Sequence, residues 1–128
     1  MGLLNGRITG WGAYAPEQVL TNLELEQRLD TSDEWIVQRS GIRERRVSHV
    51  PGSDLAAVAG FRALAAAGVD VEDVDLLIVA TCTPDTVIPS TAAHVQKKMG
   101  AKNAAVFDLN AGCSGFVYGT NVAAQYLW

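Results

Sequence analysis

Cys113 is the residue of this 128-residue chain whose type and setting best suit covalent chemistry. It lies in the run Asn110-Ala111-Gly112-Cys113-Ser114-Gly115-Phe116, between a predicted strand and a predicted helix. In open parallel sheets, ligands bind beyond the carboxyl ends of the strands. A helix N-terminus favours the thiolate and presents N–H groups to a developing oxyanion. The setting favours acyl transfer through a thioester; the alternative is a buried cysteine that only fills apolar space.

The other cysteine, Cys82, follows a second predicted strand but leads into Thr83-Pro84-Asp85 without a glycine-rich turn. We interpret it as a packing or pocket-wall residue. The two cysteines are far apart and have no Cys-x-x-Cys motif or His/Cys cluster beside them, so we expect no metal site. The first ten residues lack a secretory signal, and the apolar runs are too short to cross a membrane. We therefore expect a reduced, cytoplasmic chain without membrane association.

Composition narrows the function classes further. Hydrophobic residues make up 48% of the chain and charged residues 19%, which is enough apolar material for a core and excludes wholesale disorder. Ten basic residues against fourteen acidic ones give a net charge of −4. A general nucleic-acid binder is excluded, because phosphate neutralisation normally requires a basic excess.

Alternating strand and helix patterns predict a parallel α/β sheet in one continuous unit. Thr21 with Glu24 and Thr31 with Glu34 form the spacing of capping boxes, and Ser53 with Asp54 is expected to cap a long helix. The predicted strands cover residues 7–14, 75–81 and 104–108, and residues 41–47 form a strand or a loop. The predicted helices cover residues 21–29, 31–40, 53–67, 90–99 and 115–128.

Several sequence blocks then identify a family. The blocks are Asp30-Thr31-Ser32-Asp33-Glu34-Trp35-Ile36, Gly41-Ile42-Arg43-Glu44-Arg45-Arg46 and Phe107-Asp108-Leu109-Asn110-Ala111-Gly112-Cys113-Ser114-Gly115-Phe116. In this order, the chain resembles the N-terminal half of β-ketoacyl-acyl carrier protein synthase III, of the thiolase superfamily. The resemblance implies a thiolase-like layered α/β/α/β/α fold. Residues 1–128 would be most of its N-terminal half, with the C-terminal half absent.

The resemblance also assigns roles to single residues. Cys113 matches the acyl-accepting nucleophile, and Trp35 matches the tryptophan that stacks on the adenine of coenzyme A (CoA). Arg39, four residues after Trp35, matches a CoA-contacting arginine, and Thr31 matches a threonine of the same pocket. Ile88, in a loop that crosses the dimer in the family, matches the floor of the acyl pocket, where a smaller side chain would admit longer or branched primers. The alternatives are a core tryptophan at Trp35 and a simple helix cap at Thr31.

Arginines form the basic cluster of this acidic chain, at Arg39, Arg43, Arg45 and Arg46. Phosphate contact at the CoA entrance is the functional interpretation. For Arg45 and Arg46 we favour the alternative, a solvated or internally paired face.

The implied reaction joins an acyl group, usually acetyl from acetyl-CoA, to malonyl-acyl carrier protein in a homodimer, with CoA as part of the substrate and no further cofactor. The family's catalytic histidine and asparagine lie in its second half. His49, His94 and Asn110 do not match them, so we expect this chain alone to be inactive. The alternatives are a starter enzyme of polyketide or other specialised metabolism, a hydroxymethylglutaryl-CoA synthase-like protein, or a noncatalytic assembly half.

Overall fold

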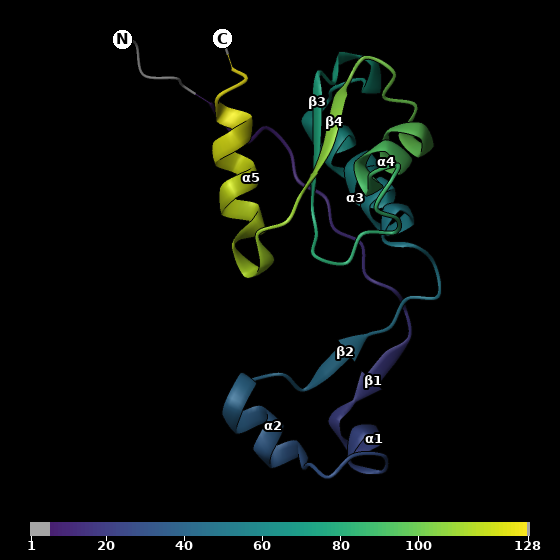
Figure 1. Ribbon diagram of the computed structural model, residues 1–128, viewed down its shortest axis with the longest axis vertical. Coiled ribbons are helices and arrows are strands. Elements are labelled where there is room, and N and C mark those ends of the chain that lie inside the picture. The colour runs from purple at the N-terminus through teal and green to yellow at the C-terminus, as the bar shows by residue number, and fades with distance from the viewer. Residues whose placement is uncertain (1–5, 128) are drawn as a thin grey trace. The chain divides into compact units, whose positions relative to one another are not determined.

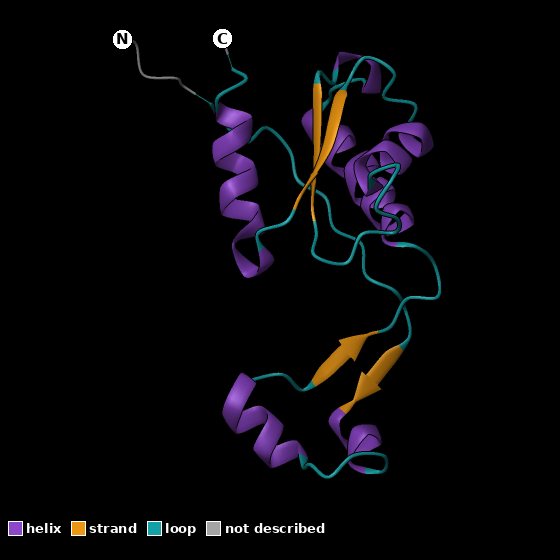
Figure 2. Ribbon diagram, viewed as in Figure 1, coloured by secondary structure: helices purple, strands orange, loops and turns teal. Residues whose placement is uncertain are grey.

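The computed structural model describes residues 6–127 and groups them in two compact units. The larger unit contains the residues up to Tyr14 and those from Pro51 onwards, and the smaller unit is Ala15–Val50. Each unit contains a two-stranded sheet and helices. Figure 2 shows the strands in orange and the helices in purple. That residues 1–128 form an incomplete thiolase-like half stays a prediction.

A parallel sheet forms the centre of the larger unit. β3 (Leu76–Ala80) pairs with β4 (Ala105–Leu109) along their whole lengths. α3 (Gly52–Ala67) and α4 (Thr91–Met99) pack against each other on one side of this sheet, and α5 (Gly115–Ala124) packs against β3 on the other (Figure 1). The predicted parallel α/β arrangement is therefore confirmed.

The side chains of β3 alternate between these two helix layers, as the pleat of a strand requires. Leu77 and Val79 pack against the buried core on the α3 and α4 side, whereas Leu76, Ile78 and Ala80 line the α5 side. A strand that is apolar on both faces is typical of a parallel sheet covered by helices on both sides. The buried cluster consists mainly of small residues, which let the helices approach closely: Ala57, Val95, Met99, Ala101 and Ala104.

Residues 6–14 lie along α3 without forming a strand, so the predicted strand over residues 7–14 is wrong. Gly10 and Gly12 explain the path of this segment. A Cβ atom on Gly10 would overlap the backbone carbonyl of Ala63, and one on Gly12 would overlap that of Ala59. The two glycines thus allow the backbone of this segment to lie close to the backbone of α3. No strand among the described residues pairs with the segment.

The smaller unit joins two short strands to two helices. β1 (Val19–Thr21), which the sequence patterns did not indicate, pairs antiparallel with β2 (Glu44–Arg46). α1 (Asn22–Glu26) follows β1 directly, and α2 (Asp33–Ser40) precedes β2. The open choice between strand and loop for residues 41–47 is therefore resolved as a short strand at Glu44–Arg46.

The first capping box is present, but the second is replaced by a neighbouring residue. The Thr21 hydroxyl accepts the N–H of Glu24, whose carboxylate accepts the N–H of Thr21 at 2.8 Å. The helix that follows is shorter than predicted and ends at Glu26. At α2 the predicted box of Thr31 is wrong, because the adjacent Ser32 is the N-cap and accepts the N–H of Trp35 at 3.1 Å.

The long helix α3 also begins differently from the prediction. Its N-cap is Pro51, which offers no side-chain acceptor, so Ser53 and Asp54 lie inside the first turn and do not cap it. Gly68 ends the helix in the left-handed region, at φ 65°, as predicted. The last helix, α5, ends at Ala124, short of the predicted residue 128, which lies outside the described residues.

Candidate functional site

Cys113 lies in a tight helical turn immediately before α5. The turn is a 3₁₀ segment, η2 (Gly112–Ser114), which runs directly into the helix at Gly115. Gly112 has a φ of +52°, a conformation that residues with a Cβ rarely adopt. The Cys113 side chain is exposed and forms no disulfide. The predicted position of Cys113 at the start of a helix is therefore confirmed, the alternative of a buried cysteine is wrong, and the role of nucleophile stays a prediction.

The beginning of α5 packs closely against the end of β3. A Cβ atom on Gly115 would lie 3.0 Å from the Cβ of Ala80, so glycine lets the helix start directly beside the strand. No side chain of the described residues caps α5: its N-cap, Ser114, makes no side-chain hydrogen bond to the helix. Within the turn, the N–H groups of Ser114 and Gly115 donate to the carbonyls of Ala111 and Gly112, whereas the N–H of Cys113 makes no hydrogen bond among the described residues and can still donate to an oxyanion.

Ile88 lies in the loop between β3 and α4, together with Val87. Both side chains are almost fully exposed, at 88% and 86%. Because β3 and β4 are parallel, this loop and the Cys113 turn leave the sheet at the same edge. Cys82, at the start of the same loop, is also exposed and free, so the packing role is wrong, while the alternative of a pocket-wall residue stays a prediction.

Trp35 and Thr31 line one pocket in the smaller unit. The pocket encloses about 380 Å³ and is formed by Asp30, Thr31, Ser32 and Trp35. The Trp35 side chain is 55% exposed, so the alternative of a core tryptophan is wrong. An exposed indole offers a π-face to a base, and Thr31, relieved of helix capping by Ser32, keeps its hydroxyl at the pocket wall.

The four arginines divide into two pairs. The Arg45 guanidinium donates to the side-chain oxygen of Asn22 at 2.6 Å, and Arg46 lies 3.5 Å from the Glu44 carboxylate. The expectation of internal pairing for these two residues is confirmed. Within residues 6–127, the guanidinium groups of Arg39 and Arg43 form no hydrogen bond or ion pair, and both residues are exposed. Arg39 and Arg43 are therefore the two arginines of the cluster whose guanidinium groups remain available to bind a phosphate.

Asn22 organises the smaller unit, and sequence reasoning missed it. Its side chain is 1% exposed and donates to the Asp33 carboxylate at 2.7 Å and to the Ile42 carbonyl at 2.8 Å, while its oxygen accepts from Arg45. These bonds fasten the start of α2, which carries Trp35, to the neighbouring strand. The sequence offered little signal, because Asn22 stands among other polar residues, between Thr21 and the Leu23-Glu24 pair.

The two histidines have structural contacts. His49 contacts the side-chain oxygen of Gln18, and His94 lies 3.0 Å from the Thr86 hydroxyl. In the described part of the chain, no three His, Cys, Asp or Glu side chains are grouped so that they could hold a metal ion. Over the same residues, no helix has the length and apolar character needed to cross a membrane.

The predicted site residues thus form two groups in different units. Thr31, Trp35 and Arg39 belong to the smaller unit, with Thr31 and Trp35 in one pocket and Arg39 one helical turn further along α2. Cys113 and Ile88 belong to the larger unit, on loops that follow adjacent parallel strands.

Comparison with known proteins identifies the chain. It is 55% identical over 120 residues to "β-ketoacyl-[acyl-carrier-protein] synthase III 2" of Vibrio cholerae serotype O1, covering 94% of this chain and 33% of that protein. The crystal structure of 3-oxoacyl-[acyl-carrier-protein] synthase III from Aquifex aeolicus superimposes with a TM-score of 0.89 at 45% identity, covering 93% of this chain and 39% of that one. Over the residues that it covers, the chain belongs to the β-ketoacyl-[acyl-carrier-protein] synthase III family.

A second similar structure comes from polyketide biosynthesis. The priming β-ketosynthase of the R1128 polyketide pathway has a TM-score of 0.86 at 36% identity, over 93% of this chain and 36% of its own. No family model matches the chain. The expected thiolase-like fold class of synthase III is confirmed, and the chain spans about a third of the length of the curated relatives it matches.

Proposed function

We propose that this chain is the nucleophile-bearing part of a β-ketoacyl-acyl carrier protein synthase III, a condensing acyltransferase that starts fatty acid synthesis. The observation that carries the proposal is the exposed Cys113 thiol in a tight turn that enters α5 uncapped, at the carboxyl edge of a parallel sheet. An accessible thiol at the entrance of a helix, with its own backbone N–H free of a partner among the described residues, suits thioester exchange.

In the proposed first half-reaction, the Cys113 thiolate attacks the thioester carbonyl of an acyl-CoA, with acetyl-CoA as the expected primer. The carbonyl oxygen becomes an oxyanion, which the N–H of Cys113, without a partner among the described residues, would stabilise. The bond to the CoA sulfur breaks, CoA leaves as a thiolate that takes up a proton, and the acyl group remains on Cys113. One thioester replaces another, so no oxidant, metal or further cofactor is required.

The proposed second half-reaction joins this acyl group to malonyl-acyl carrier protein. Loss of carbon dioxide leaves an enolate of the carrier-bound thioester, which attacks the acyl carbonyl on Cys113. The new carbon–carbon bond forms as the bond to the cysteine sulfur breaks, which regenerates the thiolate. The groups that polarise the malonyl thioester belong to a part of the enzyme outside this chain, so we propose that residues 1–128 alone do not condense.

We propose that the smaller unit binds CoA. The exposed Trp35 indole would stack on the adenine, Thr31 would contact it from the same pocket, and Arg39 would bind a phosphate. Support comes from the pocket of about 380 Å³ and from the exposed guanidinium of Arg39. We further propose a cytoplasmic homodimer, in which the loop of Ile88 lines the acyl pocket.

The experiment is intact-mass measurement of the full-length protein after mixing with acetyl-CoA. We expect one acetyl adduct, absent from Cys113→Ser and retained by Cys82→Ser, which is a matched control because both cysteines are exposed and free. An unmodified Cys113 in a folded full-length protein would support the alternative of a noncatalytic assembly protein.

A polyketide starter enzyme is the second candidate, and the likeness to the priming β-ketosynthase of the R1128 pathway favours it. It uses the same cysteine chemistry, so the adduct on Cys113 does not distinguish the two. The distinguishing measurement is which carrier protein accepts the acyl unit from Cys113, the one of fatty acid synthesis or one dedicated to another pathway.

A further inference from the structure

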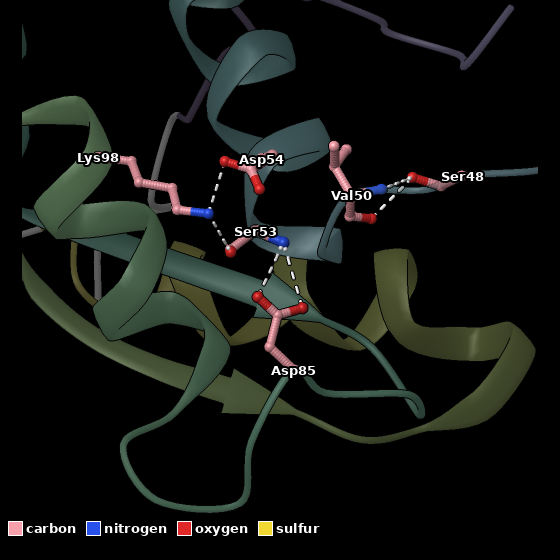
Figure 3. A network of polar contacts seen from close by, with 6 residues as sticks. All are labelled: Ser48, Val50, Ser53, Asp54, Asp85 and Lys98. Atoms are coloured by element: carbon pink, nitrogen blue, oxygen red, sulfur yellow. Dashed lines mark hydrogen bonds and ion pairs between the residues drawn. The ribbon is translucent and has the colours of Figure 1, made fainter.

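The N-terminus of α3 is capped from a distant loop by Asp85. Pro51 gives the helix no side-chain cap, and the N–H of Ser53 instead donates to both carboxylate oxygens of Asp85, at 3.2 and 3.3 Å (Figure 3). Gly52 adjoins the same carboxylate: a Cβ there would lie 3.2 Å from an Asp85 oxygen. The loop between β3 and α4 is thereby fastened to the beginning of α3.

The same residue fastens the loop to α4. The backbone N–H of Asp85 donates to the Thr91 hydroxyl at 3.0 Å, in the first turn of α4. Thr91 and Ala92 in turn donate their N–H groups to the two carboxylate oxygens of Asp108, at 2.8 and 2.7 Å. Asp108 lies in β4, the strand that leads to Cys113. A continuous series of hydrogen bonds therefore joins the nucleophile's strand to the loop.

A lysine adds a positive charge to this network of carboxylates. The Lys98 ammonium donates to the Ser53 hydroxyl at 2.8 Å and to the Asp54 carboxylate at 2.6 Å (Figure 3). Burial raises the pKa of Asp85, but hydrogen bonds from Ser53 and Gly52 and the charge of Lys98 outweigh burial and hold the pKa below its ordinary value. Asp85 is thus held as the carboxylate that accepts these N–H groups.

The tip of the loop contrasts with this fixed base. Val87 and Ile88 project with 86% and 88% of their surface exposed. Behind them, the Thr86 hydroxyl donates to the Pro89 carbonyl at 2.6 Å. Two large apolar side chains therefore stand on a backbone that is hydrogen-bonded on both sides, an arrangement suited to presenting a fixed surface to an apolar ligand.

We propose that Asp85 is a positioning residue that fixes the loop of residues 83–89 and thereby sets which acyl primer reaches Cys113. The selectivity part rests on the proposed function, in which Ile88 lines the acyl pocket. Asp85 does not touch the primer. It acts by holding the backbone behind Ile88 in one position, so that the pocket has one size.

The test compares Asp85→Ala, Asp85→Asn and the control Asp70→Ala in the full-length protein. Asp70 is an exposed aspartate of the same unit whose side chain makes no capping hydrogen bond. The first readout is amide hydrogen exchange over residues 52–54 and 83–91. The second is the ratio of the rates at which acetyl-CoA and isobutyryl-CoA acylate Cys113.

We expect Asp85→Ala to exchange about tenfold faster in both segments, to lose at least about half of its primer discrimination, and to leave the remaining core protected. Asp85→Asn, which keeps one acceptor oxygen, should lie between the parent and Asp85→Ala, and Asp70→Ala should match the parent. Should Asp85→Ala fail to fold, Thr91→Val removes the second bond of the loop at nearly constant volume and should alter the same ratio.

Unchanged exchange in the loop would overturn the proposal, and so would faster exchange with an unchanged primer ratio. Failure of the proposed function looks different: the parent itself would form no adduct with either thioester. In that case the proposed role of Asp85 in primer selectivity is also wrong. The hydrogen-exchange result still decides whether Asp85 fixes the loop.

Discussion

The backbone N–H of Thr81 donates to the carbonyl of Leu109 at 3.0 Å, one residue beyond the end of β3 and at the last residue of β4. This bond continues the parallel pairing to the edge where the two loops begin. Cys82 follows Thr81 directly, and Cys113 comes four residues after Leu109. Their different settings, an open loop and a glycine-flanked helical turn, make only Cys113 the expected nucleophile.

Coenzyme A binding should depend on the exposed face of α2. Trp35→Leu removes a stacking surface worth about 1–3 kcal/mol per base, so we expect CoA affinity to fall about tenfold. Arg39→Gln should also weaken binding, and it should reduce the dependence of binding on salt, because it removes a phosphate contact. Titration calorimetry measures both. The control is Lys102→Gln, which removes one exposed positive charge from the larger unit and should leave affinity unchanged.

Ile88 should influence primer size. Ile88→Phe places a larger, flatter side chain at the tip of the loop, so we expect preference to shift from branched or longer acyl-CoA primers towards acetyl-CoA. Competition between two primers for Cys113, read by intact mass, gives the ratio directly. Val87→Phe is the neighbouring control, because Val87 is equally exposed but does not match the pocket position. Equal ratios in the parent and Ile88→Phe would remove Ile88 from the pocket.

Asn22 should be important for the stability of the smaller unit. Asn22→Ala removes a buried side chain that makes three hydrogen bonds to partly buried or exposed partners, and we expect the free energy of unfolding to fall by about 2 kcal/mol. Urea unfolding followed by circular dichroism measures this change. Asn103→Ala removes one hydrogen bond at an exposed site, to the Glu72 carbonyl, and should cost about 0.5 kcal/mol or less. Equal losses in the two variants would contradict the central role of Asn22.

The stability contribution of Asp85 should depend on pH. Its pKa in the folded protein lies below the ordinary 3.8, so the carboxylate stabilises the fold above that value and loses its contribution as pH falls through the lower, folded-state pKa. We expect Asp85→Asn to be less stable than the parent by on the order of 1 kcal/mol at neutral pH, a difference that shrinks in acid. Urea midpoints measured from about pH 7 to about pH 3 check the sign. A gap that widens in acid would contradict it.

Glycines predicted the ends of three helices. Gly41, Gly68 and Gly100 each end a helix at positive φ, because only a residue without a Cβ adopts that conformation at little cost. Such a signal depends on one residue and its neighbours. The cysteine turn was equally local, and the family resemblance depended on three short blocks of sequence in a fixed order.

Features that depend on distant partners could not be predicted in this way. Asp85 caps α3 from 32 positions away, and the partners of the Asn22 side chain lie 11, 20 and 23 positions along the chain. The strand predicted at residues 7–14 was wrong for the same reason: a strand forms only when it pairs with another strand, and that partner cannot be recognised from the local sequence. Alternating glycines there served close packing on α3 and had the period of a strand only by coincidence.

Capping at a distance has a consequence for the order in which the molecule forms. α3 leaves the ribosome before Asp85, and α4 before Asp108, so during synthesis α3 has no side-chain cap and α4 has only the local cap of Ser90. A helix of nine residues such as α4 is marginal on its own in water. Its completion therefore waits for the strand that leads to Cys113, and we expect the two helices and this strand to become ordered together, in one late cooperative step.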